Sequence, residues 1–211
     1  MMRFSVWRTR RMLDERSVPL TDPSITRLAD RMAAAMGIPA IKVRVFEVEP
    51  VNGLAAPDGR IFLTRGFLNR KAQGEVTAEE LASVIAHEMG HVAQGHMRRR
   101  MIDFTGQNAV FVMLSALLNR FLPFIGIWIA NLISTALMAR LSRRDEFEAD
   151  AWASALLIKS GIGTGPQKSL FRKLEALTQN RAEGVPAWLL SHPHVEERIA
   201  AIEANEARWV G

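Results

Sequence analysis

Two histidines four residues apart, with a glutamate between them, carry the clearest chemical signal in this chain. His87, Glu88 and His91 form an HExxH pattern in a stretch that no proline interrupts. On a helix, side chains four residues apart lie on one face, so both imidazoles can bind one metal ion. Glu88 points about 100° around the helix, where its carboxylate can act as a general base toward a metal-activated water. The pattern predicts metal-dependent hydrolysis.

The composition limits which residues can complete such a site. The 211 residues include no cysteine, which excludes a disulfide framework, a thiolate zinc site and a cysteine nucleophile. A catalytic zinc ion has three protein ligands and an open position for water, so the third ligand must be a histidine or a carboxylate. Until it is found, two surface histidines one turn apart remain the alternative interpretation.

The strongest candidate for the third ligand lies in the later stretch SRRDEFEADAWASALL. Glu146 and Asp150 are four residues apart and share a helix face, whereas Glu148 lies nearly opposite them and Asp145 is displaced by about 100°. We therefore predict Glu146 as the ligand and Asp150 as an acceptor for the N–H of a ligand histidine. The alternative is an exposed acidic start of a helix, near the favourable end of its dipole.

Turn and cap signals predict the elements that must position these residues. Asp22 as N-cap, Pro23 at the first helical position and Gly37 as stop predict a helix at the beginning of the chain. Alternating apolar residues and a Pro-Asp-Gly turn predict a small antiparallel sheet of about three strands, at 41–48, 51–55 and 61–64. Thr77 and Glu80 form a capping box, so the HExxH residues lie on a helix.

Further helices are predicted at 143–160, 166–181 and 194–207, the first of them ended by Gly161. The expected fold class is α+β and predominantly helical, with a small antiparallel sheet and an active-site HExxH helix. We expect one domain over residues 1–211, with 1–21 as a basic N-terminal segment.

An apolar insert separates the two groups of metal-binding candidates. Residues 104–139 carry one charge, Arg120, and 121–139 carry none, which is at the limit for a membrane span. In a two-helix hairpin, arginines at 98–100, 140, 143 and 144 would lie beside the catalytic site. The positive-inside rule then predicts a membrane-associated protein with its site on the cytoplasmic side. The alternative is an apolar helical pair folded over the zinc helix, or a surface for self-association.

The basic balance of the chain, a net charge of +5, allows anionic partners. No tyrosine is present and no stretch interleaves aromatic with basic residues, which argues against nucleic acid as a partner. The first sixteen residues contain five arginines, and no apolar segment of signal-peptide length follows them. We therefore expect no cleavable signal peptide.

Four segments, taken in order, carry a resemblance to a known family. They are VNGLAAPDGRIFLTRGFLN at 51–69, HEMGH at 87–91, EFEAD at 146–150 and SHPHVEERI at 191–199. Together they resemble the gluzincin metallopeptidases that include HtpX and the CAAX-prenyl endopeptidase. HtpX also separates its zinc motif from the third ligand by hydrophobic helices. It has further hydrophobic helices before the zinc domain, and we predict none in the stretch before residue 77 of this sequence.

The resemblance implies one zinc ion per chain, held by His87, His91 and Glu146, with Glu88 as the general base. It implies that His192, in a His-Pro pair, donates a hydrogen bond to the oxyanion of the tetrahedral intermediate. It also implies that Arg198 holds an acidic partner such as Asp150.

The resemblance further implies an edge strand on which an extended peptide substrate is laid, formed by Asn52, Gly53, Leu54, Ala55 and Ala56. Gly53 and Leu54 depart from the family's usual alanine and aromatic residue, which leaves the substrate preference open. His194 stands where the family has a second proline. We take His194 and His96 as non-ligands.

These observations predict a zinc-dependent endopeptidase that acts on unfolded or membrane-proximal polypeptides. The first alternative is a zinc-holding, proteolytically idle quality-control factor whose edge strand captures clients. The presence of Glu88 argues against it, because a structural zinc closes its fourth position with another protein ligand. The second alternative, a basic nucleic-acid-linked protease, predicts strongly salt-dependent DNA binding.

Overall fold

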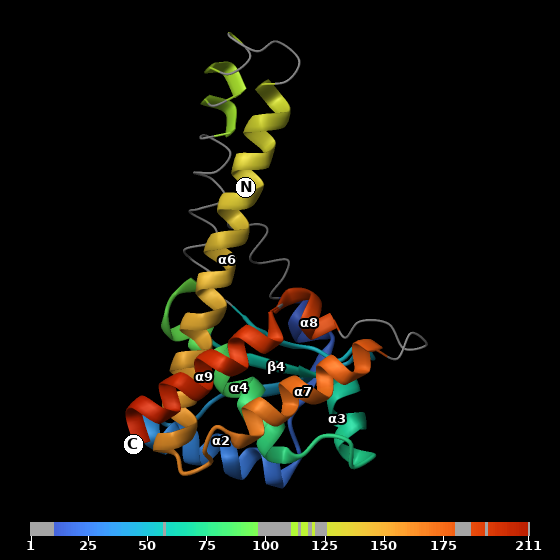
Figure 1. The fold of residues 1–211 in the computed structure, drawn as a ribbon. Coiled ribbons are helices and arrows are strands. Elements are labelled where there is room, and N and C mark those ends of the chain that lie inside the picture. The colour runs from blue at the N-terminus through green and yellow to red at the C-terminus, as the bar shows by residue number, and fades with distance from the viewer. Residues whose placement is uncertain are drawn as a thin grey trace.

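The structure, a computed structural model, describes residues 11–56, 58–96, 111–113, 115–117, 120, 126–179, 187–192 and 194–210. All four described strands lie in the first third of the chain, where one helix separates the first strand from the other three, and helices follow (Figure 1). The elements are β1 (Ser17–Pro19), α2 (Pro23–Met36), β2 (Val43–Phe46), β3 (Gly53–Ala55), β4 (Ile61–Thr64), α3 (Arg65–Ala72), α4 (Ala78–Ala93), α6 (Gly126–Lys159), α7 (Gly165–Gln179), α8 (Ala187–Ser191) and α9 (Val195–Val210). The predominantly helical α+β class predicted from the sequence is confirmed.

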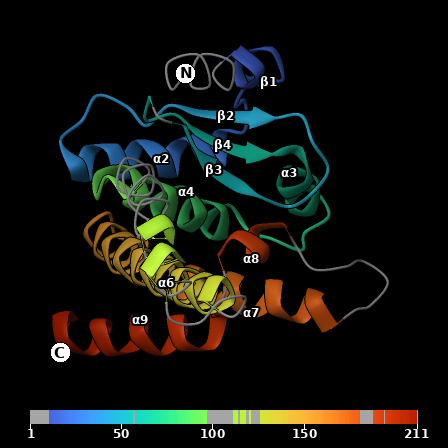
Figure 2. The ribbon, with the colours of Figure 1, turned by 90° about the horizontal axis from the view of Figure 1, so that it is seen from above.

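The HExxH helix α4 lies at the centre of the layers. Seen from above, the sheet lies on one side of α4, and α6, α7 and α9 lie on the other (Figure 2). Every residue of α4 from Glu80 to His91 is buried. A helix buried on all sides can present functional side chains only into an internal site, so the fold directs the histidines inward.

The sheet differs from the predicted antiparallel one. Among the described residues, four strands form it in the order β1-β2-β4-β3, and β2 pairs with β4 in parallel. The prediction was therefore wrong in strand direction, and it missed β1, which pairs antiparallel to β2 from within the basic N-terminal segment. Alternation of apolar residues sets which face of a strand is buried, but neither strand order nor direction.

Burial explains why β4 takes the central position. Ile61 and Leu63 enter the main core with α2 and α4, whereas Phe62 packs on the opposite face with Phe46. All four residues of β4 are buried. A strand buried on both faces needs a neighbour on each side for its backbone groups, and β2 and β3 provide them.

The predicted caps of α2 and α4 are confirmed. Asp22 accepts hydrogen bonds from the backbone N–H groups of the first turn of α2, and Gly37 ends that helix in the left-handed conformation with a φ of 70°. At the start of α4, the Thr77 side chain accepts from the Glu80 N–H while the Glu80 side chain accepts from the Thr77 N–H. The capping box thus fixes where the HExxH helix begins.

α6 is longer than predicted. It starts at Gly126, inside the apolar insert, and continues without interruption through the predicted acidic helix to Lys159. No glycine or proline occurs between Ile127 and Ser160 to break it. The beginning of α6 projects far from the body of the protein (Figure 1).

Most of the first arm of the predicted hairpin lies outside the described residues. Among the helices that the structure describes, none combines the length and the apolar character needed to cross a bilayer.

The remaining helices follow their predictions. α7 and α9 lie within a few residues of the predicted bounds, and Gly161 follows α6 with a φ of 70°. After β4 the sequence allows either a short helix or a loop, and the structure forms the helix α3 there. The short helix α8, which leads into the His-Pro segment, was not predicted.

Candidate metal centre

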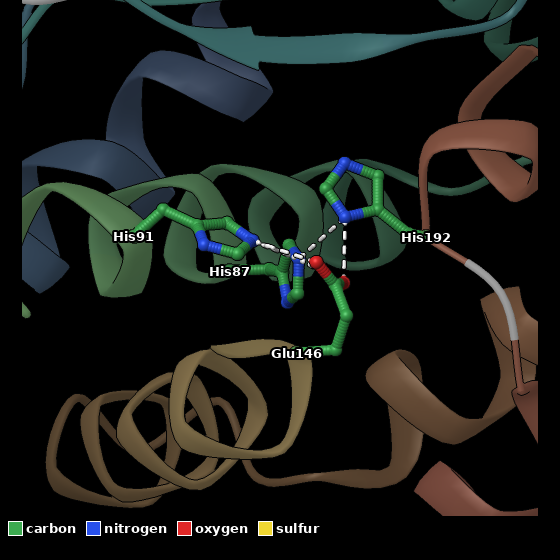
Figure 3. A group of neighbouring side chains, drawn as sticks. All are labelled: His87, His91, Glu146 and His192. Carbon is green, nitrogen blue, oxygen red and sulfur yellow. Dashed lines mark hydrogen bonds and ion pairs between the residues drawn. The ribbon is translucent and has the colours of Figure 1, made fainter. Parts of the chain in front are cut away.

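Four side chains from three parts of the chain converge beside α4. His87 and His91 extend from α4, Glu146 faces them from α6, and His192 approaches from the segment after α8 (Figure 3). All four are buried, and each offers one possible ligand atom within 4.8 Å of the others. The structure therefore brings together the three residues predicted as ligands and the residue predicted as the oxyanion donor.

The spacing of the three predicted ligands fits a tetrahedral metal ion. His87 Nε2 lies 3.1 Å from His91 Nε2, and each of these nitrogens lies 3.4 Å from an oxygen of Glu146. Ligands bound to zinc at about 2.0–2.1 Å in tetrahedral geometry stand roughly 3.3–3.4 Å apart. The three residues consequently fit a zinc ion without rearrangement.

The electrostatics of the pocket favour positive charge where these atoms meet. Burial opposes ionisation of Glu146, but hydrogen bonds from His192, His87 and His91 hold its pKa well below the usual range. Burial also disfavours a charged His87, yet its hydrogen bonds with Asp150 and Glu146 raise its pKa to about 9. A bound cation would meet the same negative field.

His192 has different surroundings from the other two histidines. Its Nδ1 lies 2.6 Å from Glu146 Oε2 and 3.2 Å from His87 Nε2, and its Nε2 lies 3.5 Å from Glu88 Oε1. Burial is the main cause that lowers the pKa of His192 to about 4, so the ring is neutral at physiological pH. A neutral imidazole can donate one hydrogen bond and accept another, or bind a metal.

Asp150 and Arg198 form the layer that holds His87. Asp150 Oδ1 lies 2.9 Å from His87 Nδ1, while Arg198 donates to both carboxylate oxygens of Asp150, from Nε at 2.5 Å and from Nη2 at 2.8 Å. The same guanidinium donates from Nη1 to the backbone oxygen of His192 at 3.0 Å. Arg198 is fully buried, and its charge helps to lower the pKa of Asp150 to about 2 against the effect of burial.

Several residues of this layer were not predicted from the sequence. Trp188 stacks on His192 with ring centroids 4.9 Å apart, and Arg198 lies over the rings of Trp188 and Phe171. Gln167 donates to Asp150 from α7. No spacing in the sequence identifies these residues, because they come from helices whose order in space only the tertiary fold sets.

Gly90, within the HExxH segment, allows the two ligand-bearing helices to approach each other. A Cβ at this position would stand 2.7 Å from the backbone oxygen of Ala149. α4 and α6 therefore cross with backbone against backbone at the level of Glu146 and Asp150, which a larger side chain would prevent. The glycine inside HEMGH is the feature of the sequence that corresponds to this contact.

The predicted substrate strand lies next to Glu88. β3 is the last strand of the sheet and pairs with β4 only, within the part of the chain that is described. A Cβ on Gly53 would stand 2.5 Å from Val84 Cγ1 and 3.7 Å from Glu88 Oε1, so the β3 backbone lies directly on α4 beside that carboxylate. In this chain, an alanine at position 53 would therefore require Val84 to move.

The two histidines predicted as non-ligands lie in contrasting places. His194 is exposed with a φ of 69° and belongs to none of the candidate clusters of the described residues. His96 is buried and lies against His91, in a second group with Asp145 and Glu148.

A helix that carries HExxH, faced by a glutamate from a second helix beside a small sheet, defines a metallopeptidase of the gluzincin class. The chain belongs to peptidase family M48, whose model matches residues 19–206. It is thus a metalloendopeptidase, and the family implies a bound metal, generally zinc. The predicted resemblance and enzyme class are confirmed.

Relatives named as proteases match most of the chain. Metalloprotease LoiP of Escherichia coli (strain K12) is 28% identical over 181 residues, which cover 84% of this chain and 70% of that protein. A Protease HtpX homolog of Janthinobacterium sp. (strain Marseille) is 28% identical over 204 residues, 82% of this chain and 69% of that protein. Protease HtpX of Pseudomonas paraeruginosa is 26% identical over 220 residues, 86% and 72% of the two chains.

Proposed function

We propose that this metalloendopeptidase hydrolyses peptide bonds of unfolded or membrane-proximal polypeptides with one zinc ion per chain. The proposed ligands are His87, His91 and Glu146, and the single observation that carries this assignment is their mutual spacing of 3.1–3.4 Å. Zinc in such a set supplies Lewis acidity, which makes water nucleophilic near neutral pH and polarises a carbonyl.

Glu88 is the proposed general base. Its carboxylate is buried beside the cluster, on the next position of α4 after His87, and it is not among the converging ligand atoms. There it can accept a proton from the attacking water and return it to the leaving amine. His192 is the proposed oxyanion donor, since its Nε2 lies on the same side of the pocket as Glu88 Oε1. This role requires the ring proton on Nε2, which leaves Nδ1, beside Glu146, without one.

The open edge of β3 is the proposed substrate platform. The N–H of Thr64 donates to the carbonyl of Asn52 and the N–H of Ala56 donates to the carbonyl of Arg60, so residues 52, 54 and 56 face β4. By the alternation of an antiparallel ladder, the backbone groups of Gly53 and Ala55 then point toward the open edge. A peptide paired there would run past Glu88 with little dependence on its own side chains.

The proposal is tested by replacing the general base alone. In a casein assay on zinc-loaded protein, Glu88→Gln is expected to lower kcat by about 10²–10⁴-fold, the usual contribution of a positioned base. Zinc content should stay at one per chain. Hydrolysis at the wild-type rate by zinc-loaded Glu88→Gln would contradict the assignment of Glu88.

The substrate platform has its own test. Ala55→Pro removes an N–H of the open edge while keeping the ladder bonds to β4, and proline is tolerated at such edges. We expect KM for an extended peptide to rise while kcat and the unfolding midpoint change little. Leu54→Pro is the matched control, because it removes a ladder bond and should lower stability instead. An unchanged KM for Ala55→Pro would remove β3 from the substrate site.

Membrane association through 104–139 is part of the proposal. Trp128, Leu132 and Ile133 are exposed on the projecting beginning of α6. Tryptophan and aliphatic side chains of this kind suit the interface of a bilayer. The arginines that flank the insert in the sequence favour a site on the cytoplasmic side.

One observation favours the proteolytically idle alternative. His192 Nδ1 is within reach of the same point as the three proposed ligands, and a fourth protein ligand would close the position that water needs. This alternative predicts bound zinc without turnover of unfolded substrates by the wild-type protein. The active-enzyme proposal predicts bound zinc together with turnover of unfolded substrates.

A further inference from the structure

His96 is a buried histidine that the mechanism above does not use. Its Nδ1 lies 2.8 Å from His91 Nδ1, and its Nε2 lies 3.2 Å from Glu148 Oε2 and 3.8 Å from Asp145 Oδ1. Its side chain is 1% exposed. The ring therefore stands between a proposed zinc ligand of α4 and two carboxylates of α6.

The local backbone explains this position. α4 ends at Ala93, and Gly95 then takes a φ of 66°, which reverses the chain so that His96 returns to the face of His91. Apart from the two neighbours in the chain, no heavy atom of the described residues lies within 4 Å of the place where a Cβ on Gly95 would be. The glycine thus serves the backbone conformation and not a close contact.

When zinc is bound, only one placement of the ring protons allows His91 and His96 to form a hydrogen bond. Coordination by His91 Nε2 uses that lone pair, so the proton of the neutral ring is on Nδ1. His91 Nδ1–H must then donate to His96 Nδ1. His96 in turn carries its proton on Nε2, where Glu148 Oε2 accepts it at 3.2 Å, and Asp145 Oδ1 lies 3.8 Å away.

The same placement of protons argues against a second metal ion on His96, Asp145 and Glu148, although the three residues lie close together. A metal on His96 Nε2 would leave the proton of the neutral His96 ring on Nδ1. Two N–H groups would then face each other across 2.8 Å. The first site excludes the second.

We propose that His96 is a positioning residue for the metal centre: it accepts the hydrogen bond of His91 Nδ1–H and, held by its own hydrogen bond to Glu148, fixes the ring orientation and tautomer of that ligand. This role rests on the proposed zinc site, and it gives both ligand histidines a hydrogen-bonded group that orients them. Asp150 orients His87, and His96 orients His91. Groups that orient metal ligands in this way typically contribute about 10–100-fold to metal affinity.

The affinity of the purified metal-free protein for Zn²⁺, measured by competition with a chelator, tests the inference. His96→Ala is expected to weaken binding about 10–100-fold. His96→Asn keeps an acceptor oxygen near the place of Nδ1 and should recover most of the loss. His194→Asn is the matched control, since it changes an exposed histidine outside the clusters and should bind zinc as the wild type does.

A spectroscopic readout separates positioning from a general structural role. In the zinc-loaded wild type, ¹⁵N–¹H correlation spectra of the imidazoles should show the Nε2–H tautomer for His96 and the Nδ1–H tautomer for His91. Equal zinc affinity of wild type and His96→Ala, or an Nδ1–H tautomer for His96, would overturn the inference and leave the zinc site standing. Failure of the wild type to bind zinc would overturn both.

Discussion

At one end of α6 charged side chains are buried, and at the other end large apolar side chains are exposed, which is the reverse of the usual distribution in proteins. Its inner half, residues 145–157, buries Asp145, Glu146 and Asp150 beside α4, each at most 3% exposed. Its outer half, residues 128–136, exposes Trp128 at 74% and Leu132 at 69%. One uninterrupted helix thus holds charges where water is excluded and large apolar groups where water reaches.

The difference shows what each half needs in order to be stable. A buried carboxylate persists only when it is paired, and the inner half pairs Glu146 with the histidines and Asp150 with Arg198. The exposed apolar side chains have no such compensation within the described residues, and the membrane surface is our proposal for what covers them. The inner half is explained by chemistry within the chain, whereas the outer half is explained by the proposed membrane surface.

The largest expected effect concerns the ligand of the inner half. Glu146→Gln keeps the shape of the side chain but removes the charge that faces both ligand histidines. We expect zinc affinity and casein hydrolysis each to fall by more than the roughly 100-fold typical of an orienting residue. Glu203→Gln, at the exposed surface of α9, is the control and should retain both. Full zinc loading of Glu146→Gln would remove Glu146 from the ligand set.

Breaking the ion pair between Arg198 and Asp150 should have the next largest effect, which is on the free energy of unfolding. Arg198→Met preserves much of the volume but leaves Asp150 buried without its guanidinium, which typically destabilises a protein by about 3–5 kcal/mol. Urea unfolding measures the change. Arg144→Met, in α6, provides the comparison, because that side chain is 74% exposed and its ion pair with Glu148 contributes about 1 kcal/mol or less. Similar losses for both variants would contradict the distinction between buried and exposed pairs.

An ordinary helix cap away from α6 gives a reference for these effects. Partial burial opposes ionisation of Asp22, but hydrogen bonds from Lys71, Ser24 and Ile25 outweigh it and lower its pKa to about 2. A lowered folded-state pKa stabilises the protein above the ordinary value of 3.8, and this stabilisation disappears as the pH falls toward 2.

Two variants measure the contribution of this cap by urea unfolding. Asp22→Ala should cost about 1 kcal/mol at pH 7. Asp22→Asn keeps a capping oxygen but cannot titrate, so the stability difference between wild type and Asp22→Asn should shrink between pH 4 and pH 2. A difference that stays constant over this range would show that the ionised carboxylate contributes nothing.

The smallest effect on stability is expected in the outer half of α6. Leu132→Gln replaces an exposed side chain, so the free energy of unfolding should change by no more than about 0.5 kcal/mol. Flotation with vesicles that contain anionic lipid should nevertheless decrease, most strongly when Trp128→Gln is added. Leu157→Gln, in the buried inner half, is the contrasting control and should destabilise strongly. Unchanged flotation of the double variant would contradict the membrane surface.

Local signals in the sequence predicted the helices and the closeness of the side chains proposed as ligands. The Asp22 cap, the capping box of Thr77 and the spacing of four between His87 and His91 depend on neighbouring residues only, and the structure reproduces each of them. Glu146 and Asp150 could be selected because a helix puts both on one face, and they do face α4 together.

Features that depend on distant pairing could not be predicted in the same way. The parallel pairing of β2 with β4 depends on the path of the chain through β3, which no local pattern encodes. The stacking of Trp188 on His192 and the contact of His96 with Glu148 each join different elements. For His96, the turn at Gly95 was a local signal, but its meaning depends on where α6 lies.

The central claim is that His87, His91 and Glu146 hold one zinc ion, and anomalous diffraction at the zinc edge from zinc-loaded crystals tests it most directly. We predict a single strong peak about 2.0–2.2 Å from His87 Nε2, His91 Nε2 and a carboxylate oxygen of Glu146. No peak should occur beside His96. A dominant peak at His96, Asp145 and Glu148, or none between α4 and α6, would contradict the account.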